Sequence, residues 1–115
     1  MSEPVRETLD RLLARASAEA AGLDEDLRAL FEASRSSNAD DEHDPEGATI
    51  AFERAQLSAT LDATRRRIGE LRTAVERLDR GTYGICEDCG RPIPAERLAA
   101  RPGARTCVAC AGRRR

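Results

Sequence analysis

Apolar residues recur along two segments of the chain at alternating spacings of four and three, which is the pattern of a coiled-coil seam. In the first segment they are Leu9, Leu13, Ala16, Ala20, Leu23, Leu27 and Leu30. In the second segment they are Leu57, Leu61, Thr64, Ile68, Leu71, Val75 and Leu78. Each segment is therefore expected to form one long helix, whose narrow apolar stripe must be covered by another helix.

Proline and glycine mark where the two helices begin and end. Pro4 is suited to a first helical position, and Asp44 followed by Pro45 offers a capping carboxylate and a second proline of this kind. Gly81 is a typical C-terminal stop. The predicted helices are residues 4–36 and 45–80, each about 50 Å long at 1.5 Å per residue.

The segment between the helices is too short for them to run parallel. A loop of about eight residues cannot carry the chain back along a helix, so an antiparallel coiled-coil hairpin is predicted over residues 1–80. If residues whose numbers sum to 84 face each other, six pairs of seam residues match, from Leu27 with Leu57 to Leu9 with Val75. Toward the loop the seam decays, because Leu30 then faces Arg54, and burial is expected to fall there. Loop closure favours this monomer over a dimer built from the same seams, which is the alternative.

All four cysteines lie in two Cys-x-x-Cys pairs, at Cys86, Cys89, Cys107 and Cys110. One tight turn of this type supplies two of the four tetrahedral ligands of zinc, and Gly90 suits a turn that needs a positive φ. The spacing predicts one structural Zn²⁺ held by all four cysteines. Two disulfides of a redox site are the alternative. A catalytic zinc is not expected, because it needs an open position that four sulfurs do not leave.

Residues 81–115 hold too few large apolar side chains to fold around a core of their own. These are Tyr83, Ile85, Ile93, Leu98 and Val108. Metal binding to thiolates supplies on the order of 10 kcal/mol of folding free energy, so zinc is expected to take the place of a core. The predicted fold class is mainly α, with a long antiparallel coiled-coil hairpin followed by a small C-terminal four-cysteine zinc-finger knob over residues 81–115.

Five carboxylates crowd the tip of the predicted hairpin, over residues 37–47. They are Asp40, Asp41, Glu42, Asp44 and Glu46. Charge of this sign argues against contact with DNA phosphates. One interpretation of the tip is a solvated turn in which Asp44 caps the second helix. The other is a set of carboxylates that the long hairpin places in a basic channel of a partner protein assembly. Phe52 falls opposite the seam and is an exposed contact candidate.

Composition excludes several classes of protein. The chain has no lysine and a net charge of −2, whereas a nucleic-acid binder usually has a basic stripe with interleaved aromatic residues. No apolar run approaches the roughly eighteen residues of a membrane helix, and the N-terminus lacks signal-peptide features, so a cytoplasmic protein with reduced thiols is expected. No nucleophile with a base, phosphate-binding loop or open metal site is found, so no enzyme is predicted.

The motif Gly-x-Cys-x-x-Cys-Gly-x-x-Ile at residues 84–93, followed by IPAERLAARPGARTCVAC, resembles the DksA/TraR family of bacterial transcription factors. The predicted coiled coil with an acidic tip, which precedes these residues in the sequence, is a further point of resemblance. This resemblance implies a protein that binds RNA polymerase without contacting DNA. Its coiled coil would enter the secondary channel, with the tip near the active site, and alter initiation at selected promoters, often together with the alarmone ppGpp.

The tip of that family carries the motif Asp-x-x-Asp-x-Ala. Asp41 and Asp44 match its two aspartates, and Glu46 stands where the alanine is expected. The resemblance therefore implies that these three residues bind the partner, with an added charge that weakens, alters or redirects the effect. Two other functions stay open. One is a coiled-coil adaptor for another protein, and the other is a zinc-finger nucleic-acid-binding protein that uses Arg101, Arg105 and Arg113 to Arg115.

Overall fold

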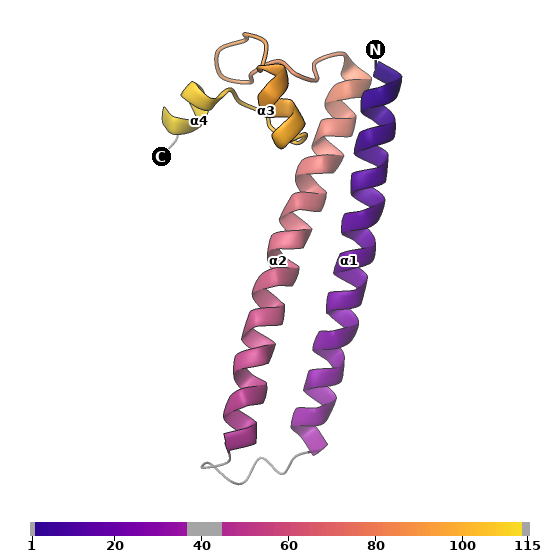
Figure 1. The fold of residues 1–115 in the computed structure, drawn as a ribbon, viewed down its shortest axis with the longest axis vertical. Coiled ribbons are helices and arrows are strands. Elements are labelled where there is room, and N and C mark those ends of the chain that lie inside the picture. Colours follow the sequence, from indigo (N-terminus) through magenta and orange to yellow (C-terminus); the bar gives the residue numbers. More distant parts are fainter. Residues whose placement is uncertain (1, 37–44, 114–115) are drawn as a thin grey trace. The chain divides into compact units, whose positions relative to one another are not determined.

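The computed structural model describes residues 2–36 and 45–113, and these residues form four helices. The helices are α1 (Ser2–Ser36), α2 (Pro45–Arg80), α3 (Ala95–Ala100) and α4 (Val108–Arg113) (Figure 1). The only strand-like pairing in the described part of the chain is an isolated antiparallel bridge between Ile85 and Pro92. The prediction of a mainly α fold is confirmed.

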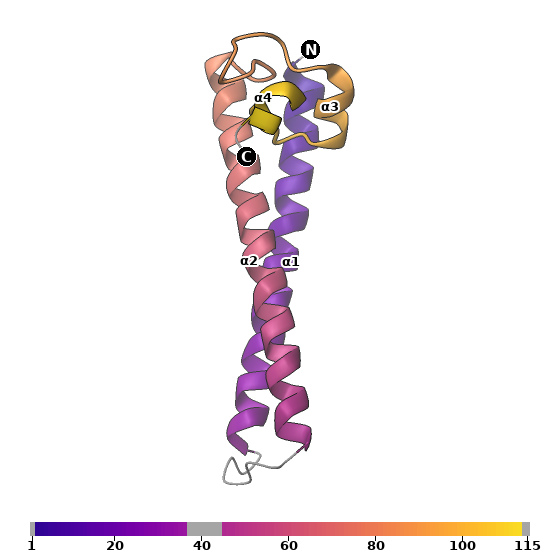
Figure 2. The same cartoon turned by 90° about the vertical axis from the view of Figure 1, so that its left-hand side faces the viewer.

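Two compact units make up the fold. One contains Met1–Arg15 with Arg67–Arg115, and the other contains Ala16–Arg66. The helices α1 and α2 pair as a helical hairpin, and the start of α1 lies beside the end of α2 in both views (Figures 1 and 2). The predicted division of the chain at residue 80 stays a prediction. No described helix is both long enough and apolar enough to cross a membrane.

The ends of the long helices follow from proline and glycine. α2 begins at Pro45 and ends at Arg80, as predicted. Gly81 has a φ of 76°, and its N–H donates to the carbonyl of Leu78 at 3.1 Å, which satisfies an otherwise unpaired carbonyl of the last turn. α1 begins at Ser2, two residues before the predicted start. Proline in the first turn does not end a helix, because the N–H groups there have no intrahelical partner.

The predicted seam is the apolar face of the hairpin. All fourteen seam residues are buried or half-buried. The fully buried ones are Leu9, Ala16, Leu61, Thr64, Ile68 and Leu71. Thr64 is 0% exposed although it is polar, and its hydroxyl donates to the carbonyl of Thr60 at 2.9 Å, so its polar atom is satisfied within α2.

Burial falls toward the acidic loop, as the sequence predicts. In residues 17–35 and 47–60 no described side chain is buried. Here the ring of Phe31 is 48% exposed, and the guanidinium carbon of Arg54 lies 5.0 Å from its centroid, a cation–π contact. Phe52 is 64% exposed, so its predicted exposure is confirmed. This part of the hairpin holds together with little buried apolar area.

A second face of α2 is covered by the segment that contains the cysteines. Ala74 and Arg77 lie off the seam, yet they are only 3% and 7% exposed. Gly103 approaches this face so closely that a Cβ added to it would lie 3.3 Å from the Cβ of Glu70. Arg101 also forms an ion pair with Glu70 at 3.7 Å. In the unit Met1–Arg15 with Arg67–Arg115, α2 therefore buries residues on two faces, one toward α1 and one toward the cysteine-containing segment.

Candidate metal centre

The first Cys-x-x-Cys pair lies on a tight loop that follows α2. The backbone N–H of Cys86 donates to the carbonyl of Arg91 at 2.8 Å, and the N–H of Gly90 donates back to the carbonyl of Cys86 at 3.0 Å. Gly90 has a φ of 74°, so the prediction that this turn needs a positive φ is confirmed. These bonds fold the loop back on itself, so that Cys86 and Cys89 present their sulfurs to the same side.

The second pair begins in a loop and continues into α4. Cys107 immediately precedes α4, and its carbonyl accepts the N–H of Ala111 at 2.9 Å. Cys110 lies within α4 and is buried. One backbone hydrogen bond, from the N–H of Glu87 to the carbonyl of Arg105 at 2.9 Å, joins the two loops. A helical turn and a knuckle-shaped loop thus bring the two pairs together.

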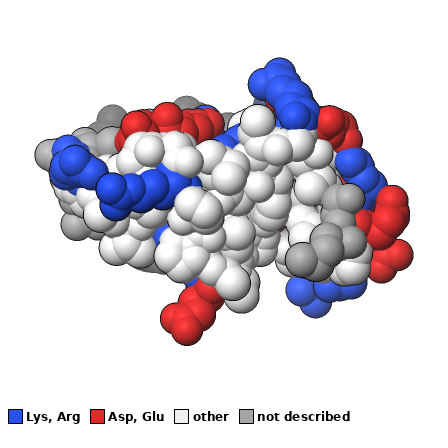
Figure 3. All heavy atoms as spheres, turned by 90° about the horizontal axis from the view of Figure 1, so that it is seen from above, with Lys and Arg blue, Asp and Glu red and all other residues white. Residues whose placement is uncertain are grey.

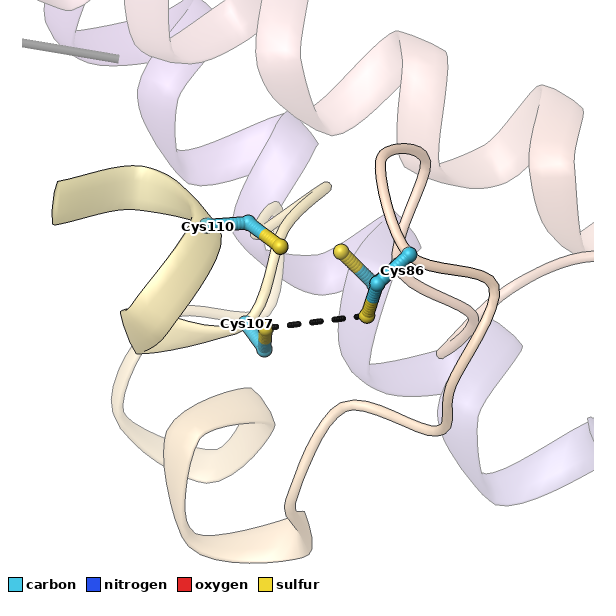
Figure 4. A group of neighbouring side chains, drawn as sticks. Cys86, Cys107 and Cys110 are labelled. Carbon is cyan, nitrogen blue, oxygen red and sulfur yellow. Dashed lines mark hydrogen bonds between the residues drawn. The ribbon is translucent and has the colours of Figure 1, made fainter. Parts of the chain in front are cut away.

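The four cysteine sulfurs form one cluster. All lie within 4.8 Å of one another, and the sulfurs of Cys89 and Cys107 are 3.9 Å apart. Figure 4 shows the side chains of Cys86, Cys107 and Cys110 directed toward a common point. Four sulfurs bound tetrahedrally at about 2.3 Å from a zinc ion lie roughly 3.8 Å apart. The donor set and its spacing fit one metal ion.

Backbone N–H groups prepare two of these sulfurs to be thiolates. The N–H groups of Cys89 and Cys107 donate to Cys86 and lower the pKa of its thiol from 9.0 to about 6. The N–H of Cys110 likewise lowers the pKa of Cys107. The hydrogen bond with Cys107, together with burial, raises the pKa of Cys110 to about 12. Without a metal the cluster therefore keeps a proton at Cys110, and a bound cation must displace it.

The cysteines supply most of the core around the cluster. Cys86, Ile93 and Cys110 are buried together, and Leu98 and Cys107 pack against them. Ile85 and Val108 are 38% and 64% exposed, so neither contributes to this core. The shortage of apolar residues predicted from the sequence is present in the structure, which makes a bound metal the natural source of folding free energy here.

Arginines near the cluster have individual partners. The guanidinium of Arg113 donates to the sulfur of Cys110 at 3.4 Å and so offsets negative charge there. Arg105 pairs instead with Glu87 at 3.7 Å. The sequence analysis missed Arg77 and Arg97, which donate to backbone carbonyls beside the cysteines. Arg77 lies off the seam and Arg97 lies outside the predicted coiled coil, and neither position gave a signal, because an arginine there usually faces solvent.

The predicted partner-binding residues of the tip are not brought to this site. Asp41 and Asp44 lie outside the described residues, so their predicted roles, and the capping role of Asp44, stay predictions. Glu46 belongs to the first turn of α2, but its side chain also lies outside the described part. The structure therefore brings together the four predicted cysteine ligands. The predicted partner-binding role of the three acidic residues stays a prediction.

A helical hairpin followed by a cluster of four cysteines defines the class of protein. Residues 81–115 match the family described as the prokaryotic dksA/traR C4-type zinc finger. The chain is also similar in fold to the transcription factor DksA2 from Pseudomonas aeruginosa, with a TM-score of 0.79 and 26% identity over 98% of this chain and 81% of that one. Residues 81–115 therefore match the zinc fingers of the DksA/TraR family, and the chain as a whole is similar in fold to DksA2.

Curated relatives match shorter stretches. The chain is 39% identical over 61 residues to the "RNA polymerase-binding transcription factor DksA" of Caulobacter vibrioides, a match that covers 53% of this chain. It is 36% identical over 72 residues to the "General stress protein 16O" of Bacillus subtilis, a match that covers 63% of this chain. The chain spans 43% and 44% of these two relatives, which is less than half of their length.

Proposed function

We propose that Cys86, Cys89, Cys107 and Cys110 bind one structural Zn²⁺, and that residues 81–115 form a finger domain behind a hairpin domain of residues 1–80. The mutual spacing of the sulfurs within 4.8 Å supports the ligand set. Elemental analysis of the purified, reduced chain is expected to find one zinc per molecule in the wild type. Cys86→Ser and Cys110→Ser are expected to lose it, and a metal-free wild type would contradict the proposal.

We propose that the protein is a bacterial transcription regulator that binds RNA polymerase. The observation that carries this proposal is the 98% coverage of the chain in its similarity to DksA2, because the likeness then includes the hairpin and not the finger alone. The name of the Caulobacter relative, an RNA polymerase-binding transcription factor, supports the same partner. In this role the protein is not an enzyme and works in the cytoplasm, where its thiols stay reduced.

The proposed mode of action uses the hairpin as an arm. Its tip enters the secondary channel of the polymerase, and Asp41 and Asp44 bring negative charge near the active site without contact to DNA. Glu46 adds a further charge at this contact. Coulombic attraction between the acidic tip and a basic channel would raise the rate of association and make it sensitive to salt.

Transcription in vitro from a ribosomal-type promoter tests this role. Addition of the wild-type protein is expected to change initiation, and Asp41→Asn and Asp44→Asn are expected to reduce the change while the variants still bind zinc. Asp62→Asn is a matched control, because it removes the same charge from an exposed position on α2. Glu46→Ala is expected to strengthen the effect, since it restores the residue that the family motif has.

Two outcomes would reject the proposal in different ways. If the wild type neither co-purifies with polymerase nor crosslinks to it from position 42, polymerase is not the partner. If the wild type is active and both aspartate variants equal Asp62→Asn, the partner stands and the assigned tip residues are wrong. A pull-down that yields another protein without polymerase subunits would instead favour the coiled-coil adaptor.

The nucleic-acid-binding alternative receives less support from the finger. Three of the arginines that it would use have intramolecular partners, since Arg101 pairs with Glu70, Arg105 pairs with Glu87 and Arg113 donates to Cys110. On the face seen in Figure 3, the basic and acidic side chains of the described residues alternate around uncharged residues and form no continuous basic surface. A salt-dependent shift of labelled DNA at physiological ionic strength would overturn this assessment.

A further inference from the structure

We propose that Arg77 and Arg97 are a matched pair of positioning residues for the metal site. Each cysteine pair is preceded by a backbone carbonyl that accepts a hydrogen bond from one of these arginines. Arg77 donates to the carbonyl of Ile85, immediately before Cys86. Arg97 donates through Nε to the carbonyl of Thr106, immediately before Cys107, at 2.8 Å. The inference rests on the proposed zinc site and adds two residues to it.

The contact of Arg77 is buried and double. Its side chain is only 7% exposed, and the same terminal nitrogen also donates to the carbonyl of Thr82 at 3.1 Å. Hydrogen bonds from a charged donor are stronger than neutral ones, and low exposure limits competition from water. Because Arg77 belongs to α2, the loop that carries the first pair is fastened to the end of the long helix.

The contact of Arg97 has the same form but a different origin. Arg97 belongs to α3 and is half-buried, while its partner Thr106 is 7% exposed. The loop that carries the second pair is therefore fastened to a short helix of the finger itself. Each half of the four-cysteine cluster thus has its own anchor, and the two anchors come from different helices.

A bond to the preceding carbonyl orients the first cysteine of each pair. The peptide group is planar, so the carbonyl of Ile85 and the N–H of Cys86 turn as one body. That N–H donates to the carbonyl of Arg91 at 2.8 Å, which holds the other side of the same plane. With the plane fixed from both sides, the Cα of Cys86 is held in place, which restricts where its sulfur can lie.

Charge alone is the competing explanation, because any arginine near four thiolates favours metal binding. Arg91 provides the matched control. It is exposed and lies two residues after Cys89, and its guanidinium has no polar partner among the described residues. Arg91→Met removes the same charge close in sequence to the first cysteine pair but leaves both carbonyl contacts in place.

Competition with a chromophoric chelator on the full chain measures the zinc dissociation constant of each variant. Arg77→Met and Arg97→Met are each expected to weaken zinc binding by about 10- to 100-fold, the usual effect of losing a residue that orients a ligand. Arg91→Met is expected to change it by less than about 3-fold. Arg77→Lys and Arg97→Lys keep the charge but not the planar donor geometry, and are expected to fall in between.

Cobalt substitution gives a readout that a change in folding stability alone does not produce. At saturating Co²⁺, the visible ligand-field bands of the Arg77→Met and Arg97→Met proteins are expected to shift from those of the wild type, because the sulfur geometry has changed. The lysine variants keep the test decisive if a methionine variant fails to fold. The inference is overturned if the methionine variants match Arg91→Met in affinity, or if the lysine variants restore wild-type affinity in full. A wild type that binds no zinc would instead remove the proposed metal site itself.

Discussion

Single residues in this chain have effects that depend on their surroundings in ways the sequence does not display. Arg77 is the clearest case. Its place in the helical repeat is off the seam, which predicts solvent exposure, yet it is 7% exposed because the cysteine-containing segment covers that face. The sequence could predict the four cysteines as ligands because their chemistry is local to the motif. It could not predict Arg77, because that role depends on tertiary packing.

Gly69 is a residue whose replacement should stabilise the protein. It lies within α2, and a Cβ added there would meet no atom within 4 Å. Alanine loses less conformational entropy than glycine on helix formation, so Gly69→Ala is expected to raise the free energy of unfolding by about 1 kcal/mol. Urea denaturation followed by circular dichroism measures this change, and no increase in the midpoint would contradict the helix-propensity argument.

Replacement of Gly90 should have the opposite effect to replacement of Gly69, because Gly90 does not lie in a helix. Its φ of 74° lies in the left-handed region, where a side chain costs roughly 1–2 kcal/mol. Gly90→Ala is therefore expected to weaken zinc binding, because the strain falls in the loop between Cys89 and Arg91. Equal zinc affinity in the Gly90→Ala and wild-type proteins would show that the loop tolerates the strained turn.

At the scale of elements, the long helices were predictable and the short helix α3 was not. Pro45 and Gly81 mark the two ends of α2, and the seam repeats over enough turns to identify both long helices. The helix α3 was missed, because its six residues contain one large apolar side chain, Leu98, and so show no period. Its position depends on the fold of the finger, in which Leu98 packs against the cysteine cluster.

Metal removal should affect the elements unequally. In the unit Met1–Arg15 with Arg67–Arg115, the buried core near the cluster consists largely of cysteine, so chelation is expected to unfold residues 82–113. Residues 16–35 and 47–66 contain no cysteine and should keep their helical structure. Amide hydrogen exchange with and without a chelator measures both regions. A uniform increase in exchange along the whole chain would contradict this division.

The finger should also lose its metal as the pH falls. The thiol of Cys86 has its pKa lowered from 9.0 to about 6 by backbone N–H groups. A group with a lowered folded-state pKa stabilises the fold fully above its unfolded value, and loses that contribution as the pH falls through the folded value. The contribution of Cys86 therefore declines from pH 9.0 to about 6. Zinc affinity is expected to fall as the pH is lowered, because protons compete with the metal for the thiolates, and an affinity that does not change with pH would contradict this.

At the scale of the whole molecule, charge is separated along the sequence. Residues 35–52 carry five acidic residues and one arginine, whereas residues 81–115 carry three acidic residues and seven arginines. The association of the protein with its proposed polymerase partner should therefore depend on ionic strength. This asymmetry was readable from the sequence, because formal charge does not depend on the fold.

The oligomeric state, predicted to be a monomer, is a further property of the whole molecule that can be tested. Because the hairpin covers its own seam, sedimentation equilibrium is expected to give the 12.5 kDa mass of one chain at all concentrations. The result should hold with zinc bound, and Gly69→Ala, which leaves the seam unchanged, is the matched control. A mass that rises to twice this value with concentration would show that the seams pair between chains.

Burial in the hairpin is concentrated away from the acidic loop, and this has an evolutionary consequence. Residues 17–35 and 47–60 contain no buried side chain among those described, so most substitutions there should cost little folding free energy. That stretch should therefore tolerate more substitutions than the residues around the four cysteines, whose replacement removes a metal ligand or its support. Substitutions in residues 17–35 and 47–60 could then change which partner surfaces the hairpin contacts while the protein still folds.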